Sequence, residues 1–67
     1  MKDLNDLTAG DLVIIHDTSN ERNLTGYYMH KIQAGGHRVW VDRFKMPMEF
    51  QSDGTTTRGR FKLRSNE

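Results

Sequence analysis

Short runs of alternating or β-branched apolar residues, separated by turn residues, recur along this chain. The pattern predicts strands, because a strand that packs one face against a core repeats its apolar positions every two residues. The expected strands cover residues 12–16, 26–33, 37–44, 48–52 and 55–64. Ahead of them, residues 3–9 are predicted to form a short helical turn with Leu4 and Leu7 on one side.

The segments between these strands carry turn signals. Residues 17–23 contain no apolar side chain, which predicts a long polar loop. Residues 34–36 (Ala-Gly-Gly) and the pair Asp53-Gly54 predict tight hairpins. Pro47 has no N–H to donate to a ladder, so it predicts a corner or an edge strand.

Five short strands joined by turns are typical of a small antiparallel barrel, in which closure removes the exposed edges of a flat sheet. The predicted fold class is therefore all-β: one five-stranded, SH3-like barrel domain over residues 1–67, with an OB-like barrel as the alternative. A chain of 67 residues has room for a single domain. It contains no cysteine, so disulfides and thiolate zinc sites are excluded, and homo-oligomerisation is a possible source of stability.

Charge is distributed unevenly along the chain. Residues 1–22 carry two basic and five acidic side chains, whereas residues 23–67 carry eight basic and four acidic ones. The net charge of +1 therefore hides a basic C-terminal part. The longest aliphatic run, residues 12–15, is far shorter than the ~20 residues of a membrane helix, and no signal-peptide pattern follows Met1. We expect a cytoplasmic protein that does not bind membranes.

Residues 10–15 (Gly-Asp-Leu-Val-Ile-Ile), followed by residues 26–28 (Gly-Tyr-Tyr), resemble the KOW type of SH3-like barrel. In that family a Gly-Asp-x-Val-x-Val strand precedes a loop and a Gly-x-Val strand. The loop here is one residue longer and lacks the glycine and lysine that the family's loop usually carries. Residues 50–54 (Phe-Gln-Ser-Asp-Gly) add a similarity to small barrel proteins of bacteriophages, which implies a phage origin and the host cytoplasm.

The last predicted strand carries a cation at every second position: Arg58, Arg60, Lys62 and Arg64. The alternation places Phe61 and Leu63 on the opposite face. Such a row fits the phosphate backbone of a nucleic acid or an acidic protein surface. The alternative is an edge strand whose outward charges prevent aggregation.

The central hairpin is rich in aromatic residues. Val39 and Val41 are expected to face the core, which directs Trp40 and Arg38 to the other side. Together with Tyr27, Tyr28 and His37 they predict a surface on which bases or a peptide stack. The expected contact residues are Tyr27, Trp40 and Arg38. The alternative is that Trp40 closes one end of the core.

No pattern indicates catalysis. The three histidines have no metal-ligand spacing, and no serine has the strand–turn–helix context of a nucleophile. The sequence predicts a non-enzymatic binding module without a cofactor or metal, whose partner is nucleic acid. The alternative is a small phage-type regulator that binds a host protein, which the net charge of +1 favours because small nucleic-acid binders are usually more basic.

Overall fold

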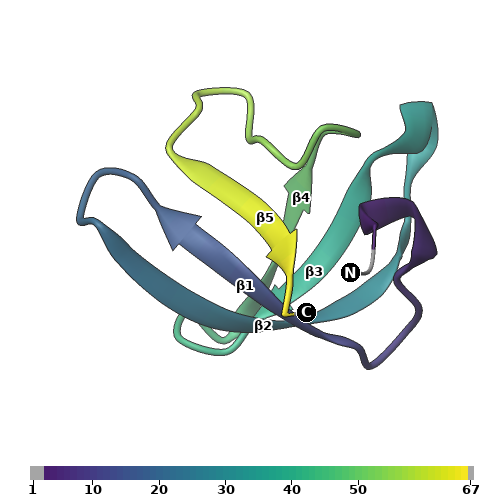
Figure 1. Cartoon of the computed structure of the whole chain (residues 1–67), viewed down its shortest axis with the longest axis horizontal. Helices are drawn as coiled ribbons and strands as arrows, with labels where there is room; N and C mark the ends of the chain where they lie inside the picture. The colour runs from purple at the N-terminus through teal and green to yellow at the C-terminus, as the bar shows by residue number, and fades with distance from the viewer. Residues whose placement is uncertain (1–2, 67) are drawn as a thin grey trace.

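The computed structural model describes residues 3–66, and within them five strands form one antiparallel sheet that curls into a half-barrel (Figure 1). The strands are β1 (Leu12–Asp17), β2 (Arg22–Lys31), β3 (His37–Val41), β4 (Met46–Phe50) and β5 (Phe61–Ser65). Two short 3-10 helices, η1 (Leu4–Asp6) and η2 (Gln33–Gly35), precede β1 and join β2 to β3. The predicted all-β class, with five antiparallel strands and a short helical turn at the start, is confirmed. Lys2 and Glu67, two of the charges counted above, lie outside the described residues.

The strand order is β4-β3-β2-β1-β5, so β1 pairs with both β2 and β5, and β4 and β5 are the edge strands. In Figure 1 the 51–60 connection carries the chain from the end of β4 to β5. Its backbone covers the outer edge of β5: Leu63 N donates to Gly54 O over 2.7 Å, and Thr56 N donates to Phe61 O over 3.2 Å. Gly54 has a φ of +89°, and a Cβ there would lie 2.8 Å from Leu63 O, so a larger residue does not fit.

The core lies inside the curl of the sheet and takes every second residue of the strands. Its buried apolar members are Leu7, Val13, Ile15, Leu24, Tyr28, Val39, Val41, Phe50 and Leu63. Gly26 belongs to the same face of β2, and it has no side chain because a Cβ would meet Ile15 Cδ1 at 2.5 Å. The expected inward positions of Val39, Val41 and Leu63 are confirmed.

Tyr28 and His37 form a polar pair within this core. The Tyr28 hydroxyl and His37 Nδ1 are 2.8 Å apart, and the two side chains are 3% and 0% exposed. Burial raises the pKa of the Tyr28 phenol. The prediction that both residues lie on an aromatic surface is therefore wrong. His37 is inward because it shares the two-residue period of Val39 and Val41.

The connection between β1 and β2 is shorter than the sequence predicts. β2 begins at Arg22 rather than at residue 26, so only residues 18–21 form the turn. Polar residues continue the ladder there, with Asp17 opposite Arg22 and His16 opposite Asn23. A lack of apolar side chains indicated a loop of residues 17–23, but the backbone hydrogen bonds of a two-stranded ribbon do not require apolar side chains.

The C-terminal strands also differ from the expected ones. Asp53 and Gly54 make a turn within the 51–60 connection, where Gly54 N donates to Gln51 O over 2.8 Å, rather than a two-residue hairpin. β5 pairs with β1 and begins only at Phe61. Pro47 lies within β4, an edge strand, as its missing N–H predicts.

The substitution Tyr28→Phe tests the buried polar pair. Removal of the hydroxyl leaves His37 Nδ1 buried without a partner, so we expect the free energy of unfolding to fall by about 1–3 kcal/mol. Urea unfolding measures the change. Tyr27→Phe is the matched control, because the neighbouring Tyr27 is 43% exposed and its change should be close to zero. Equal effects of the two substitutions would contradict the importance of the pair.

Candidate functional site

The strand residues whose side chains point away from the core make up one continuous surface, which we call the outer sheet face. Successive residues of a strand point to opposite sides, so the neighbours of each core residue share this face. Its members are Leu12, Ile14, His16, Asn23, Thr25, Tyr27, His30, Arg38, Trp40, Pro47, Glu49, Lys62 and Arg64.

An apolar row crosses four strands of the outer sheet face. Leu12 of β1 lies opposite Tyr27 of β2, Tyr27 lies opposite Trp40 of β3, and Trp40 lies opposite Pro47 of β4. Tyr27 is 43% and Leu12 39% exposed, and Trp40 and Pro47 are half-buried. Side chains opposite each other on one face lie about 5 Å apart at Cβ, so the row presents a continuous apolar surface.

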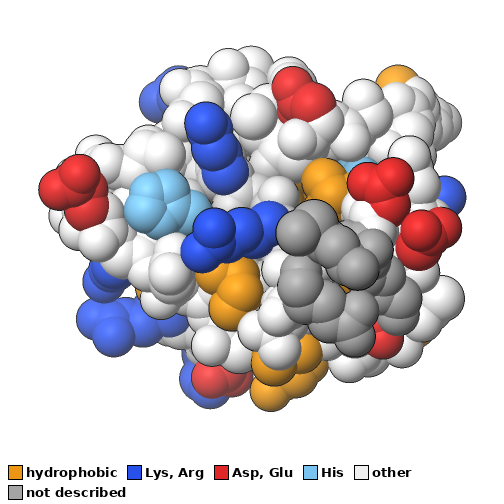
Figure 2. Space-filling view, in the orientation of Figure 1, with side chains coloured by type: hydrophobic (Ala, Val, Ile, Leu, Met, Phe, Trp, Pro, Cys, Tyr) orange, Lys and Arg blue, Asp and Glu red, His pale blue; other side chains and the backbone are white. Residues whose placement is uncertain are grey.

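Two cations belong to the same face. Arg64 of β5 lies opposite Ile14 of β1, and Lys62 lies opposite His16. Both cations are exposed, whereas Leu63 between them is buried. Figure 2 shows Lys and Arg side chains next to exposed hydrophobic ones on the side where Figure 1 shows β5 and β1. Arg64 and Tyr27 lie on strands separated by β1 alone, about 10 Å apart across the sheet, and Tyr27 is two residues along β2 from Thr25, which shares the row of Arg64.

Arg38 lies on the outer sheet face beside Trp40, and its charge is partly neutralised. Arg38 Nη1 donates to Glu49 Oε2 across β3 and β4 over 2.8 Å. The two side chains are 34% and 56% exposed, so the pair contributes about 0–1 kcal/mol to stability. A ligand with a negative group can therefore compete with Glu49 for the guanidinium at small cost.

The other two predicted cations, Arg58 and Arg60, do not lie in a strand. β5 begins after them, so the prediction of one row of four cations is wrong. Arg60 instead turns to Asp17, with its Nε 3.3 Å from Asp17 Oδ1, and its guanidinium carbon lies 5.0 Å from the centre of the Phe61 ring. Arg58 is exposed in the turn before β5.

Asp17 is a buried carboxylate that gathers polar groups from three segments, and nothing in the sequence pattern marked it. Its side chain is 0% exposed. Asn20 Nδ2 donates to Asp17 Oδ2 over 2.9 Å, and Arg22 Nε lies 3.4 Å from the same oxygen. Thr18 N and Thr18 Oγ1 both donate to Arg60 O over 2.8 Å, which holds the start of β5 against the same turn. The carboxylate therefore joins the β1–β2 turn to β5.

These contacts decide the protonation of Asp17. The hydrogen bond from the Asn20 amide, and after it the one from Arg60, hold the pKa of the Asp17 carboxyl well below its ordinary value, although burial acts in the opposite direction. A carboxylate with a lowered pKa stabilises the folded state above its ordinary pKa of 3.8, and the stabilisation is lost as the pH falls.

The described residues contain neither a cluster of metal ligands nor a helix that could span a membrane. Residues 3–66 contain no group of three or more His, Asp or Glu side chains arranged to hold a metal ion. His16 Nδ1 instead lies 3.0 Å from Asn23 Oδ1, and His30 Nδ1 lies 2.9 Å from Lys31 O. Over the same residues no helix has the length and apolarity needed to cross a bilayer.

Comparison with protein-family models, with curated proteins and with solved structures gave no match to this chain.

The substitution Asp17→Asn tests the role of the buried carboxylate. We expect the urea midpoint at pH 7 to fall, because Arg22 and Arg60 lose their anion. We also expect stability to decline less steeply than in the natural chain between pH 5 and pH 3, because one carboxylate with a lowered pKa is gone. Asp53, whose pKa is lowered by hydrogen bonds from Thr55, retains part of the decline.

Asp42→Asn is the matched control. Asp42 is exposed and forms only a surface ion pair with Lys45, 3.1 Å from Nζ to Oδ1. This variant should keep both the midpoint and the pH dependence of the natural chain. An Asp17→Asn variant as stable as the control would refute the assignment.

Proposed function

We propose that this protein is a non-enzymatic binding module whose outer sheet face contacts single-stranded nucleic acid. The observation that carries the proposal is the register of the sheet. It brings the aromatic pair Tyr27 and Trp40 onto the face that also holds Lys62 and Arg64.

The aromatic and the cationic residues of this face match the bases and the phosphates of single-stranded nucleic acid, respectively. Unpaired bases stack on aromatic side chains, with about 1–3 kcal/mol per base. Arg64 lies diagonally beyond the β1 end of the apolar row, opposite Ile14, and Lys62 lies two residues further along β5, opposite His16. Both supply positive charge for phosphates. Arg38 adds a guanidinium beside Trp40. A duplex would not suit the row, because its bases are already stacked on one another.

The arrangement of cations also limits the electrostatic part of binding. Arg60 is engaged by Asp17, and Arg58 lies outside the sheet. Of the four cations between residues 58 and 64, only two therefore face the nucleic acid, and Arg38, which is paired with Glu49, is the third cation of the outer sheet face. Stacking must then supply a large share of the affinity, and binding should be weaker and less dependent on salt than binding by a strongly basic protein.

The double substitution Lys62→Glu, Arg64→Glu tests the phosphate contacts. We expect the affinity for fluorescein-labelled oligothymidylate at low salt to fall by about tenfold, and the slope of log K against log [salt] to shrink by about 1.4, the value for two phosphates on a single strand. Fluorescence polarisation over a salt series measures both.

Arg43→Glu serves as the control for charge. Arg43 is exposed in the β3–β4 turn and is not one of the strand residues of the outer sheet face. Its reversal should leave the slope unchanged. An equal loss in both variants would show only a general response to net charge, and no binding of the natural chain at low salt would end the proposal.

Stacking is tested through the single tryptophan of the chain. Oligothymidylate should quench the emission of Trp40, and Tyr27→Ala should weaken binding by about 1–3 kcal/mol. Phe44→Ala removes another exposed ring, one outside the apolar row, and should have no effect. Binding without a change in Trp40 emission would contradict the stacking.

A further inference from the structure

The curled sheet is open between its two edge strands. Within residues 3–66, β4 and β5 do not pair with each other, and the 51–60 connection covers the edge of β5 but leaves a groove beside β4. Met48 of β4 and Phe61 of β5 occupy inward positions but are only half-buried. Met46 and Phe44, at the end of the β3–β4 hairpin, are 52% and 36% exposed. We call these four side chains the apolar strip of the β4–β5 opening.

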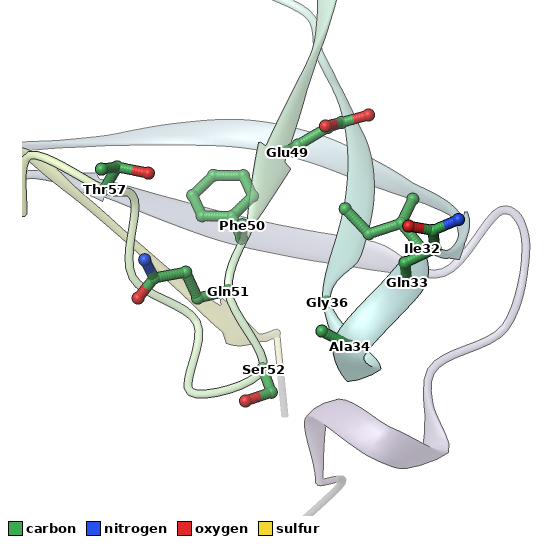
Figure 3. A pocket seen from close by; sticks show the side chains of 9 residues that line it. All are labelled: Ile32, Gln33, Ala34, Gly36, Glu49, Phe50, Gln51, Ser52 and Thr57. Atoms are coloured by element: carbon green, nitrogen blue, oxygen red, sulfur yellow. The ribbon is translucent and has the colours of Figure 1, made fainter.

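The strip continues into a hollow. A groove of about 400 Å³ lies between β4 and the end of the 51–60 connection, and its lining includes Met48, Phe61, Thr57 and Arg58. A second hollow of about 420 Å³ shares Glu49 and Thr57 with the first. Figure 3 shows the side chains that line this second hollow, which come from the 51–57 segment, from the end of β4 and from the region of η2. The two hollows therefore adjoin along β4.

The rim of the groove is positively charged. Arg58 is exposed and makes no ion pair within residues 3–66. Glu49, the acidic residue of the lining, is already paired with Arg38. A ligand that enters the groove thus meets an uncompensated guanidinium, which binds a carboxylate with two parallel hydrogen bonds.

The Phe61 ring of the opening is already occupied, which distinguishes the opening from the outer sheet face. The Arg60 guanidinium lies over the Phe61 ring, 5.0 Å from its centre. The Phe44 ring meets the Phe61 ring at 76°, with 6.2 Å between centroids. No flat aromatic row is left for a base. The thioethers of Met46 and Met48 instead adapt to aliphatic side chains.

We propose that the β4–β5 opening binds an extended segment of a partner protein that carries aliphatic side chains next to acidic ones. An aliphatic side chain fills the gap between Met48 and Phe61, and a neighbouring carboxylate pairs with Arg58. Exposed apolar patches of this kind mark protein interaction sites, and charge complementarity selects the acidic partner. This site shares Glu49 with the outer sheet face, but the proposal does not depend on nucleic-acid binding.

Synthetic peptides test the proposal on the full chain. The probe is a fluorescein-labelled Gly/Ser peptide with a central Leu-Glu-Leu-Glu stretch, and the matched peptide has Leu-Lys-Leu-Lys. We expect the acidic peptide to bind with a Kd below about 1 mM and the basic peptide to bind at least about fivefold more weakly. Fluorescence polarisation gives both affinities.

Two substitutions locate the binding. Arg58→Glu should lower the affinity for the acidic peptide about fivefold or more and raise the affinity for the basic peptide. Met46→Ser should lower the affinity for both peptides. Arg43→Glu, the same charge change at another exposed arginine, should alter neither. Equal affinities for the two peptides, indifference to Arg58→Glu, or no binding of either peptide at about 1 mM would each overturn the proposal.

Discussion

The register of β1 against its two neighbours decides which side chains share each face of this sheet. Asp17 is the last residue of β1 and lies at the end of both ladders, opposite Arg22 in β2 and Phe61 in β5. Its buried carboxylate binds groups on both sides. A slip of one residue in either ladder of β1 would exchange the core face for the outer face. The ion pairs of Asp17 therefore stabilise the register in which Leu12, Tyr27 and Arg64 point outward together, and the β2–β3 pairing adds Trp40 to the same face.

The openness of the barrel has a second consequence. In a sheet that closes by hydrogen bonds, inward side chains are covered all round. Here the 51–60 connection covers the outer edge of β5 with backbone hydrogen bonds but does not fill the space beside β4. The incomplete closure leaves Met48 and Phe61 half-buried. One small domain thus offers two surfaces of different chemistry, an aromatic and cationic face on the sheet and an aliphatic groove at its gap.

The parts of this structure that the sequence predicts are those set by local periodicity. The two-residue period places Val39 and Val41 in the core. The same period predicts that His37 is buried as well, although the aromatic-surface hypothesis placed it outside. The remaining features depend on distant pairing. Asp53-Gly54 does form a turn, as predicted. The strand after it pairs with β1 rather than with β4, and it begins at Phe61 instead of directly after the turn. The contact of Arg60 with Asp17 spans 43 residues, and no local pattern reveals it. The two surfaces likewise follow from strand order.

The most direct measurement is an amide chemical-shift map of the isotope-labelled chain with oligothymidylate at low salt. If the register produces the binding face, the largest changes fall on Tyr27, Trp40, Lys62 and Arg64, on three different strands at once. Changes confined to Met48, Arg58 and Phe61, or spread evenly over the exposed cations, would contradict the account.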